Sequence, residues 1–180
     1  MRIIAGEARG RTLLSPKGVG TRPTLDRVRE SLFSILALRV AGARVLDLFA
    51  GSGALGLEAL SRGAAHATFV DHSRAAQAAV RRNIDAMRVG DRAALLGCGW
   101  REALGRLAGA GARFTLVFLD PPYRMPDADA MLAALGASGV LAEDALVIFE
   151  HARDFRPDAG PFTVWDERAY GDTVLTFLAK

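Results

Sequence analysis

A glycine-rich stretch offers the first residues able to bind a ligand. Gly51, Gly53 and Gly56 match the G-x-G-x-x-G pattern directly after the apolar run 45–49. Such a loop lets the backbone approach a nucleotide closely at the start of a helix, so a nicotinamide or flavin cofactor is one interpretation. The pattern alone is a weak indication, because a tight connection between a strand and a helix uses the same glycines.

Two carboxylates beside this loop change the interpretation. Asp47 lies inside the apolar run before the loop, and Asp71 ends the next predicted strand. An acid at the end of the second strand suits the paired ribose hydroxyls that NAD and S-adenosylmethionine share. Asp47 would repel a pyrophosphate, whereas it can hold the ammonium of a methionyl group, directly or through water. The two acids therefore favour S-adenosylmethionine.

A second cluster, Asp120-Pro121-Pro122-Tyr123, follows the apolar run 116–119. The carboxyl end of a buried strand is where ligands bind in open α/β sheets. The Asp120 carboxylate and the Pro121 carbonyl offer two acceptors for the N–H groups of an exocyclic amine on a nucleobase. Stacking on Tyr123 would supply about 1 to 3 kcal/mol, which helps to offset the cost of extracting a base from its neighbours. The other interpretation is a strand-ending turn with a packed tyrosine.

Short apolar runs alternate with helical patterns over most of the chain, which predicts an α/β fold with a parallel sheet covered by helices on both faces. The predicted strands are 45–49, 68–70, 93–96, 116–119 and 146–149, and the predicted helices are 54–62, 73–87, 100–107 and 127–135. Residues 162–165 and 174–178 are expected to form an antiparallel hairpin. We expect one domain over residues 1–180, with a basic extension at 1–43 and a cofactor-binding core at 44–180.

The extension is expected to begin with a hairpin of strands 3–5 and 12–14, followed by a helix with Thr24 as its N-cap. It carries most of the positive charge: the segment up to Arg44 has a formal charge of +6 and the remainder −3, within a total of +3. Such a split indicates a polyanionic partner. The predicted RNA contacts are Arg9, Arg11, Arg22, Thr24, Arg27 and Arg29, with Arg27 and Arg29 facing away from the apolar stripe of the helix.

The chain has one cysteine, Cys98, and three histidines, His66, His72 and His151. A single cysteine excludes an internal disulfide and a cysteine-based zinc cluster, and the histidines lack metal-ligand spacing, so we expect no metal. No basic partner close in sequence activates Cys98, which we expect in a pocket wall. Glu150 and His151 end a predicted strand, and a surface turn is preferred to the alternative that they face the base. Without a long apolar run or a signal peptide, we expect a cytoplasmic protein that does not span a membrane.

These motifs together resemble a known family. Residues 47–53 with 120–123 resemble the class I S-adenosylmethionine-dependent methyltransferases that act on exocyclic amines. Residues 22–33 and 49–63, together with the arginine- and glycine-containing opening 2–11, are similar to the bacterial 16S ribosomal RNA guanine-N2 methyltransferases. The resemblance implies a Rossmann-like sheet of seven strands. It also implies methyl transfer from S-adenosylmethionine to N2 of a guanine in a small-subunit particle or assembly intermediate, catalysed by a monomer.

The resemblance also implies roles for individual residues. Asp120, Pro121, Pro122 and Tyr123 would hold the guanine. The cofactor-binding residues would be Asp47, Phe49, Ala50, Gly51, Ser52, Gly53, Asp71, His72, Cys98 and Gly99. Residues 97–100 depart from the wider pattern because they carry no acid for the adenine amine, which leaves backbone groups or stacking on Trp100. Three alternatives remain open: methylation of adenine N6 or another nucleic-acid amine, a nicotinamide-dependent oxidoreductase, and an inactive RNA-binding assembly factor.

Overall fold

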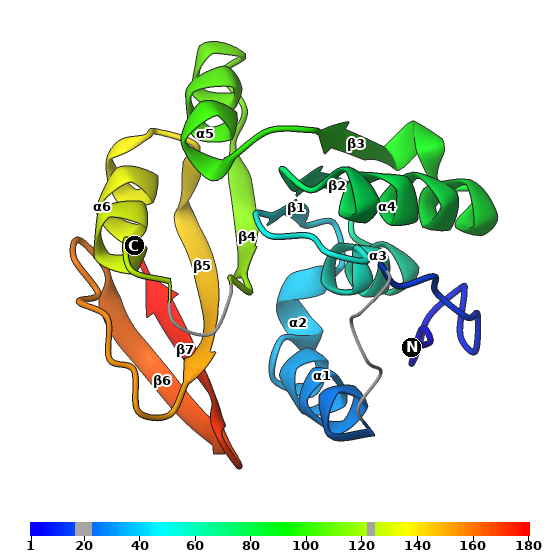
Figure 1. Ribbon diagram of the computed structural model, residues 1–180, viewed down its shortest axis with the longest axis horizontal. Helices are drawn as coiled ribbons and strands as arrows, with labels where there is room; N and C mark the ends of the chain where they lie inside the picture. Colours follow the sequence, from blue (N-terminus) through cyan, green and yellow to red (C-terminus); the bar gives the residue numbers. More distant parts are fainter. Residues whose placement is uncertain (17–22, 122–124) are drawn as a thin grey trace.

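The protein is built around one mixed sheet of seven strands (Figure 1). The computed structural model describes residues 1–16, 23–121 and 125–180, and only the backbone of residues 23–25. The strands, in the spatial order β3-β2-β1-β4-β5-β7-β6, are β1 (Arg44–Asp47), β2 (His66–Val70), β3 (Ala93–Leu96), β4 (Phe114–Leu119), β5 (Leu141–Ala152), β6 (Thr163–Tyr170) and β7 (Thr173–Ala179). Neighbours among β1 to β5 pair in parallel, whereas β7 is antiparallel to both β5 and β6. The predicted Rossmann-like α/β fold and its C-terminal hairpin are confirmed.

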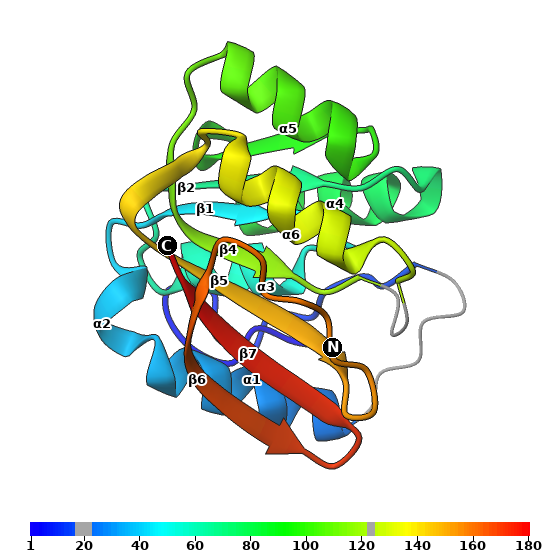
Figure 2. The same ribbon diagram turned by 90° about the vertical axis from the view of Figure 1, so that its left-hand side faces the viewer.

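Helices cover both faces of the sheet (Figures 1 and 2). They are α1 (Pro23–Ile35), α2 (Ala37–Val40), α3 (Ala54–Ser61), α4 (Arg74–Met87), α5 (Trp100–Gly109) and α6 (Ala128–Ala137), with a 3-10 turn at Gly90–Arg92. Alternate residues of each central strand serve different cores. Val45 and Leu116 pack with α1 to α4, whereas Leu46 and Val117 pack with α5 and α6. The apolar runs of the sequence are therefore strands buried on both sides, as a parallel sheet requires.

The N-terminal hairpin is simpler than the sequence predicts. Instead of two strands at 3–5 and 12–14, the chain forms one isolated antiparallel bridge between Arg2 and Thr12. This segment is held by the buried side chain of Glu58 on α3, whose carboxylate accepts hydrogen bonds from the backbone N–H of Ile4 at 2.8 Å and Ala5 at 3.0 Å. Because these bonds link the segment to α3, its position depends on contacts distant in sequence.

Helix α1 corrects two predictions. It begins at Pro23, a favoured first helical residue, so Thr24 lies in its first turn instead of capping it. Arg29 does not face solvent, because its side chain is 5% exposed and lies 3.2 Å from Asp26 and 3.9 Å from Glu58. The prediction that Arg29 is free for phosphate contact is wrong. Its burial follows from the docking of the N-terminal segment, whose Arg2 carbonyl also accepts a hydrogen bond from Arg29.

Strand β5 is longer than the apolar run 146–149. It continues through Glu150 and His151, so the predicted surface turn at these residues is wrong. The ladder with β7 extends to this end, and the buried His151 ring contacts Thr176 Oγ1 at 2.9 Å. Among the described residues, no helix is long and apolar enough to cross a bilayer.

Candidate functional site

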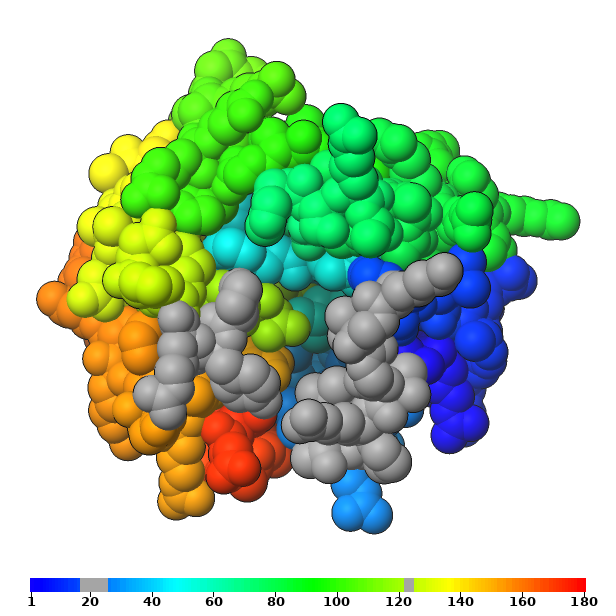
Figure 3. Space-filling view, in the orientation of Figure 1, coloured from blue at the N-terminus to red at the C-terminus, as the bar shows by residue number. Residues whose placement is uncertain are grey.

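A cavity of about 730 Å³ opens at the carboxyl ends of β1, β2 and β4. In Figure 3 the cyan segment after β1 lies in a hollow below the green segments. The sheet order changes direction here, because β1 lies between β2 and β4, and ligands bind at such a point in open α/β sheets. The cavity is lined by Met1, Asp47, Leu48, Phe49, Ala50, Gly51, Ser52, Ala54, Leu55, Asp71, His72, Cys98, Gly99, Trp100, Asp120, Pro121, Met125 and Asp127.

The glycine loop shapes one wall of this cavity. Gly51 and Gly53 have φ angles of 55° and 78°, a backbone region that favours glycine. Gly53 is the N-cap of α3 and, alone among the ten predicted cofactor residues, does not line the cavity. Gly56 packs against Phe69 so closely that a Cβ atom would lie 2.4 Å from its ring. The three glycines therefore set the turn and the helix packing that bring the loop backbone to the cavity.

Asp47 is the most electrostatically unusual residue of the wall. Its side chain is 1% exposed, and Oδ2 accepts the Gly56 N–H at 3.1 Å. Oδ1 has no hydrogen-bond partner among the described residues. Burial raises the pKa of Asp47 to about 7, the Gly56 hydrogen bond opposes this rise, and the Asp120 and Asp71 charges add to it. A ligand that brings a cation or a donor to Oδ1 would satisfy this carboxylate.

Asp71 presents a carboxylate that is fixed in orientation. Oδ2 accepts the Gly51 N–H at 2.9 Å and Oδ1 accepts the Ser73 N–H at 2.8 Å. Each carboxylate oxygen can accept a second hydrogen bond, so Asp71 can still bind hydroxyl groups while it holds the glycine loop. Its position after β2, beside the loop that follows β1, is the position at which such folds hold a ribose.

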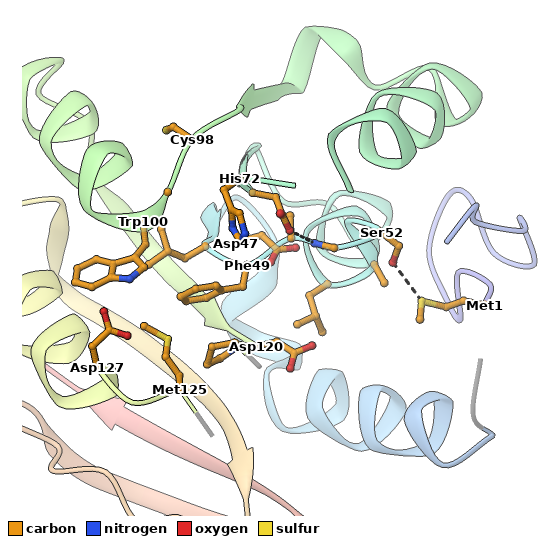
Figure 4. A pocket seen from close by; sticks show the side chains of 18 residues that line it. Met1, Asp47, Phe49, Ser52, His72, Cys98, Trp100, Asp120, Met125 and Asp127 are labelled. Atoms are coloured by element: carbon orange, nitrogen blue, oxygen red, sulfur yellow. Dashed lines mark hydrogen bonds between the residues drawn. The ribbon is translucent and has the colours of Figure 1, made fainter. Parts of the chain in front are cut away.

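Trp100 and Cys98 form the wall that follows β3. The Arg101 guanidinium lies 4.1 Å from the centre of the Trp100 ring and donates to Asp127 at 2.9 Å. In Figure 4, Trp100 and Asp127 lie at one end of the cavity, and Ser52 lies near the other. Burial raises the pKa of the Cys98 thiol, which disfavours a nucleophilic thiolate. An aromatic ring supported on one face suits stacking of a planar group on the other.

Asp120 and Pro121 line the same cavity, and Pro122 and Tyr123 lie outside the described residues. The Asp120 side chain is open to the cavity but surrounded by protein on its other sides, and this desolvation raises its pKa to about 6. Glu150, for which the sequence predicts a surface turn, lies beside it in a smaller cavity of about 80 Å³. The signal in the sequence that could have identified Glu150 is its polar side chain at a position of β5 where the alternation predicts an inward-facing apolar residue.

The predicted RNA-binding residues are only partly brought together. Arg9 and Arg27 are exposed and line a polar hollow of about 480 Å³, together with Arg2, Asp26 and Glu30. Arg11 is also exposed and donates to the Ala86 carbonyl on α4. Arg22 and the Thr24 side chain lie outside the described structure. Among the described residues, no three His, Cys, Asp or Glu side chains gather as a metal-binding group.

With this geometry established, comparison with known proteins places the chain. A family described as "Conserved hypothetical protein 95" matches residues 1–179. The chain belongs to this family. It is 37% identical over 182 residues to "Putative rRNA methyltransferase YlbH" of Bacillus subtilis (strain 168), covering 100% of this chain and 99% of that protein.

Two further matches agree with it. "Ribosomal RNA small subunit methyltransferase D" of Escherichia coli (strain K12) is 43% identical over 150 residues, which cover 83% of this chain and 74% of that protein. The solved structure of "Putative methyltransferase yhhF from Escherichia coli" superimposes with a TM-score of 0.87 at 37% identity, covering 100% of this chain and 97% of that chain. The family resemblance predicted from the motifs is thereby confirmed.

Proposed function

We propose that this protein transfers a methyl group from S-adenosylmethionine to the exocyclic N2 amine of a guanine in small-subunit ribosomal RNA. The observation that carries the proposal is that one cavity joins two carboxylates at the ends of adjacent strands, Asp120 and the buried Asp47, whose Oδ1 has no partner among the described residues. Relatives over most of the chain are named as ribosomal RNA methyltransferases, which supports this substrate.

The residues of the cavity fit the cofactor. The free Oδ1 of Asp47 would hold the methionyl ammonium, Asp71 the ribose hydroxyls, and Trp100 the adenine ring, with Cys98 and Gly99 beside it. When bound, the cofactor supplies an electrophilic methyl group on a sulfonium. A buried anion behind the glycine loop disfavours a dinucleotide pyrophosphate, which argues against the oxidoreductase alternative.

Asp120 and Pro121 would act on the substrate amine. The Asp120 carboxylate and the Pro121 carbonyl accept its two N–H groups and leave the nitrogen lone pair facing the methyl group. After direct in-line transfer the nitrogen carries an extra proton. A carboxylate with a pKa of about 6 is in place to accept that proton at neutral pH. Catalysis on this account is mainly positioning, with no covalent intermediate.

The N-terminal extension would bind the RNA. Arg9 and Arg27 are exposed and lie on the same polar hollow, so both can contact phosphate oxygens. Arg11 lies on the same extension. We propose that residues 1–43 grip RNA while residues 44–180 carry out the chemistry, within a single cytoplasmic domain that acts as a monomer on a ribosomal particle.

Methyl transfer to small-subunit particles from a strain lacking the gene tests the proposal. We expect mass spectrometry to map one methyl group to N2 of one guanine. Methylation of an adenine would select the alternative amine, and no methylation of particles or naked small-subunit RNA would refute the proposal. Titration calorimetry should show binding of S-adenosylmethionine and not of NAD.

The Asp120→Asn variant tests the site. It should lose transfer because it replaces the carboxylate by an amide with one acceptor, while it keeps cofactor binding. The exposed Asp91→Asn variant serves as the matched control and should retain both properties. Undiminished transfer by Asp120→Asn would contradict the role of Asp120.

A further inference from the structure

A second, smaller cavity adjoins the cofactor cavity at Asp120. Its volume is about 80 Å³, and helix α1 contributes Val28 and Leu32 to its wall. The two cavities share Asp120 and Leu55, as well as Met1 and Ala54, so they meet where the reacting amine would lie. Apolar side chains on α1 and α3 are suited to contact the faces of a planar ring that enters this space.

Glu150 lines this cavity together with two other polar residues, Asp120 and Arg29. Leu119 of β4 pairs in parallel with Phe149 of β5, which places Asp120 and Glu150 at the next register position on adjacent strands. Ile148 lies in the core beneath α1, and side chains alternate along a strand, so Glu150 faces the same side as Ile148. A carboxyl therefore stands where the strand pattern calls for an apolar residue.

Among the described residues, no side chain or backbone group explains the position of the Glu150 carboxyl by pairing with it. No described residue donates a hydrogen bond to it. Arg29, which lines the same cavity, donates from Nη2 to Asp26 and to the Arg2 carbonyl, and its Nε lies 3.9 Å from Glu58 without a hydrogen bond. Burial, followed by the neighbouring Asp120 charge, raises the pKa of Glu150 to about 8. A group of this kind is stabilised by a ligand that offers it a hydrogen-bond donor.

The bases differ in the hydrogen-bonding groups that they would present to Glu150. Asp120 accepts from any exocyclic amine, so it does not distinguish guanine from adenine or cytosine. In guanine one of the two ring nitrogens beside the amine, N1, carries a hydrogen, and the O6 carbonyl lies next to N1. In adenine and cytosine the ring nitrogen beside the amine is itself an acceptor. A carboxyl beside Asp120 can bind both the N1–H and O6 of guanine in its neutral form, and the N1–H in its ionised form.

We propose that Glu150 selects guanine by accepting the N1–H next to the amine that Asp120 holds, while Val28 and Leu32 contact the ring. This inference rests on the proposed function, because it assumes that the amine of a base is bound at Asp120. Helix α1 thereby has two roles, since it packs against the sheet and also closes the site that distinguishes one base from another.

The test uses RNA in which 2-aminopurine replaces the methylated guanine, introduced by ligating a synthetic segment into small-subunit RNA. This base keeps the 2-amine but lacks N1–H and O6. We expect the wild-type protein to prefer guanine in kcat/KM by about tenfold to a hundredfold, as for the loss of one hydrogen bond to a carboxyl. Equal kcat/KM for the two bases would overturn the inference.

Two variants separate selection from folding. Glu150→Leu should lower kcat/KM for guanine by a similar factor and leave 2-aminopurine nearly unchanged, which removes the preference. Glu150→Gln keeps an acceptor and a donor and should restore the preference. Both should bind S-adenosylmethionine as the wild type does, and the exposed Glu143→Leu variant, on the same strand, is the matched control.

The outcomes distinguish the selection of guanine by Glu150 from the proposed function itself. If Glu150→Leu retains the wild-type preference, the inference is wrong and the proposed function stands. If Glu150→Leu does not fold, the inference is still overturned by equal wild-type kcat/KM for the two bases, or by a Glu150→Gln variant that binds S-adenosylmethionine but shows no preference for guanine. If the wild-type protein methylates no guanine, the proposed function fails and the inference fails with it.

Discussion

Replacing Asp47 by asparagine is expected to stabilise the ligand-free protein at neutral and higher pH and to weaken cofactor binding. Asp47 is buried, with one oxygen hydrogen-bonded to Gly56 and the other unpartnered among the described residues. Asparagine has the same shape, and its side-chain oxygen can keep the Gly56 bond while the negative charge is removed. If the unpartnered carboxylate exists to meet a cationic ligand, the empty protein is destabilised by it.

The sign and size of the effect follow from the pKa. Burial raises the pKa of Asp47 from 3.8 to about 7, so the folded state binds this proton more tightly than the unfolded state. The contribution of protonated Asp47 to the free energy of unfolding is fully present below pH 3.8 and is lost as the pH rises through about 7. The total corresponds to about 4 kcal/mol, of which about 2.5 kcal/mol is lost between pH 5 and pH 8. Asparagine does not titrate, so the free energy of unfolding of the Asp47→Asn variant does not show this decline with pH.

The assay is urea unfolding of both proteins at several pH values between 5 and 8, each without ligand. The free energy of unfolding of Asp47→Asn minus that of the wild type should increase by about 2.5 kcal/mol across this range. Other groups titrate in both proteins and largely cancel in the difference. The exposed Asp91→Asn variant should show no such change.

Cofactor binding completes the test. Losing a hydrogen bond to a charged group should weaken S-adenosylmethionine binding by roughly tenfold to a hundredfold, measured by calorimetry. If the difference in free energy of unfolding between Asp47→Asn and the wild type stays constant from pH 5 to pH 8, the assignment of Asp47 as a buried acid with an unpartnered oxygen is refuted. Unchanged cofactor affinity would refute its proposed partner.

Three further predictions address other parts of the molecule. Glu58→Ala should destabilise the protein by about 3 to 5 kcal/mol in chemical unfolding, because it removes the carboxylate beside Arg62 and Arg29 and leaves two backbone donors unpaired. It should also expose the first 16 residues to limited proteolysis. Trp100→Ala should weaken cofactor binding by about 1 to 3 kcal/mol in calorimetry through lost stacking, whereas the exposed Trp165→Ala should leave it unchanged. Arg9→Ala and Arg27→Ala should each weaken RNA binding and reduce its salt-dependence slope by about 1, and an unchanged slope would argue against phosphate contact.

The central sheet and the glycine loop were predictable because they depend on short-range patterns. Fully apolar runs separated by helical periodicity specify strands buried on both faces, as the alternate packing of Val45 and Leu46 shows. The turn at Gly51 and Gly53 requires positive φ angles that favour glycine, so residue type alone locates it. Asp71 was predictable for the same reason, since it directly follows β2.

The misplaced residues depend on partners far away in sequence. Arg29 lies off the apolar stripe of α1, and only the docking of the N-terminal segment with Glu58 buries it. Glu150 and His151 interrupt an apolar run, yet β5 continues because the ladder with β7 supplies the pairing. No pattern within α1 or β5 contains that information. Met1 also lines the cavity because of a contact distant in sequence, since Ser52 Oγ donates a hydrogen bond to its sulfur.

Four acids of this chain, Glu58, Asp47, Asp120 and Glu150, differ in the partners that the fold offers them, and we propose that this difference separates one structural role from three ligand-binding roles. Glu58 is fully buried, and its carboxylate is bonded to two backbone N–H groups and to Arg62 at 2.7 Å, so it needs nothing more. For Asp47, Asp120 and Glu150, burial raises the pKa, and each lines a cavity. In sequence all four are acids in or beside apolar stretches. The unpaired carboxylate atoms therefore favour the proposed site, in which a cation and the N–H groups of a base would supply the contacts that the described residues do not make.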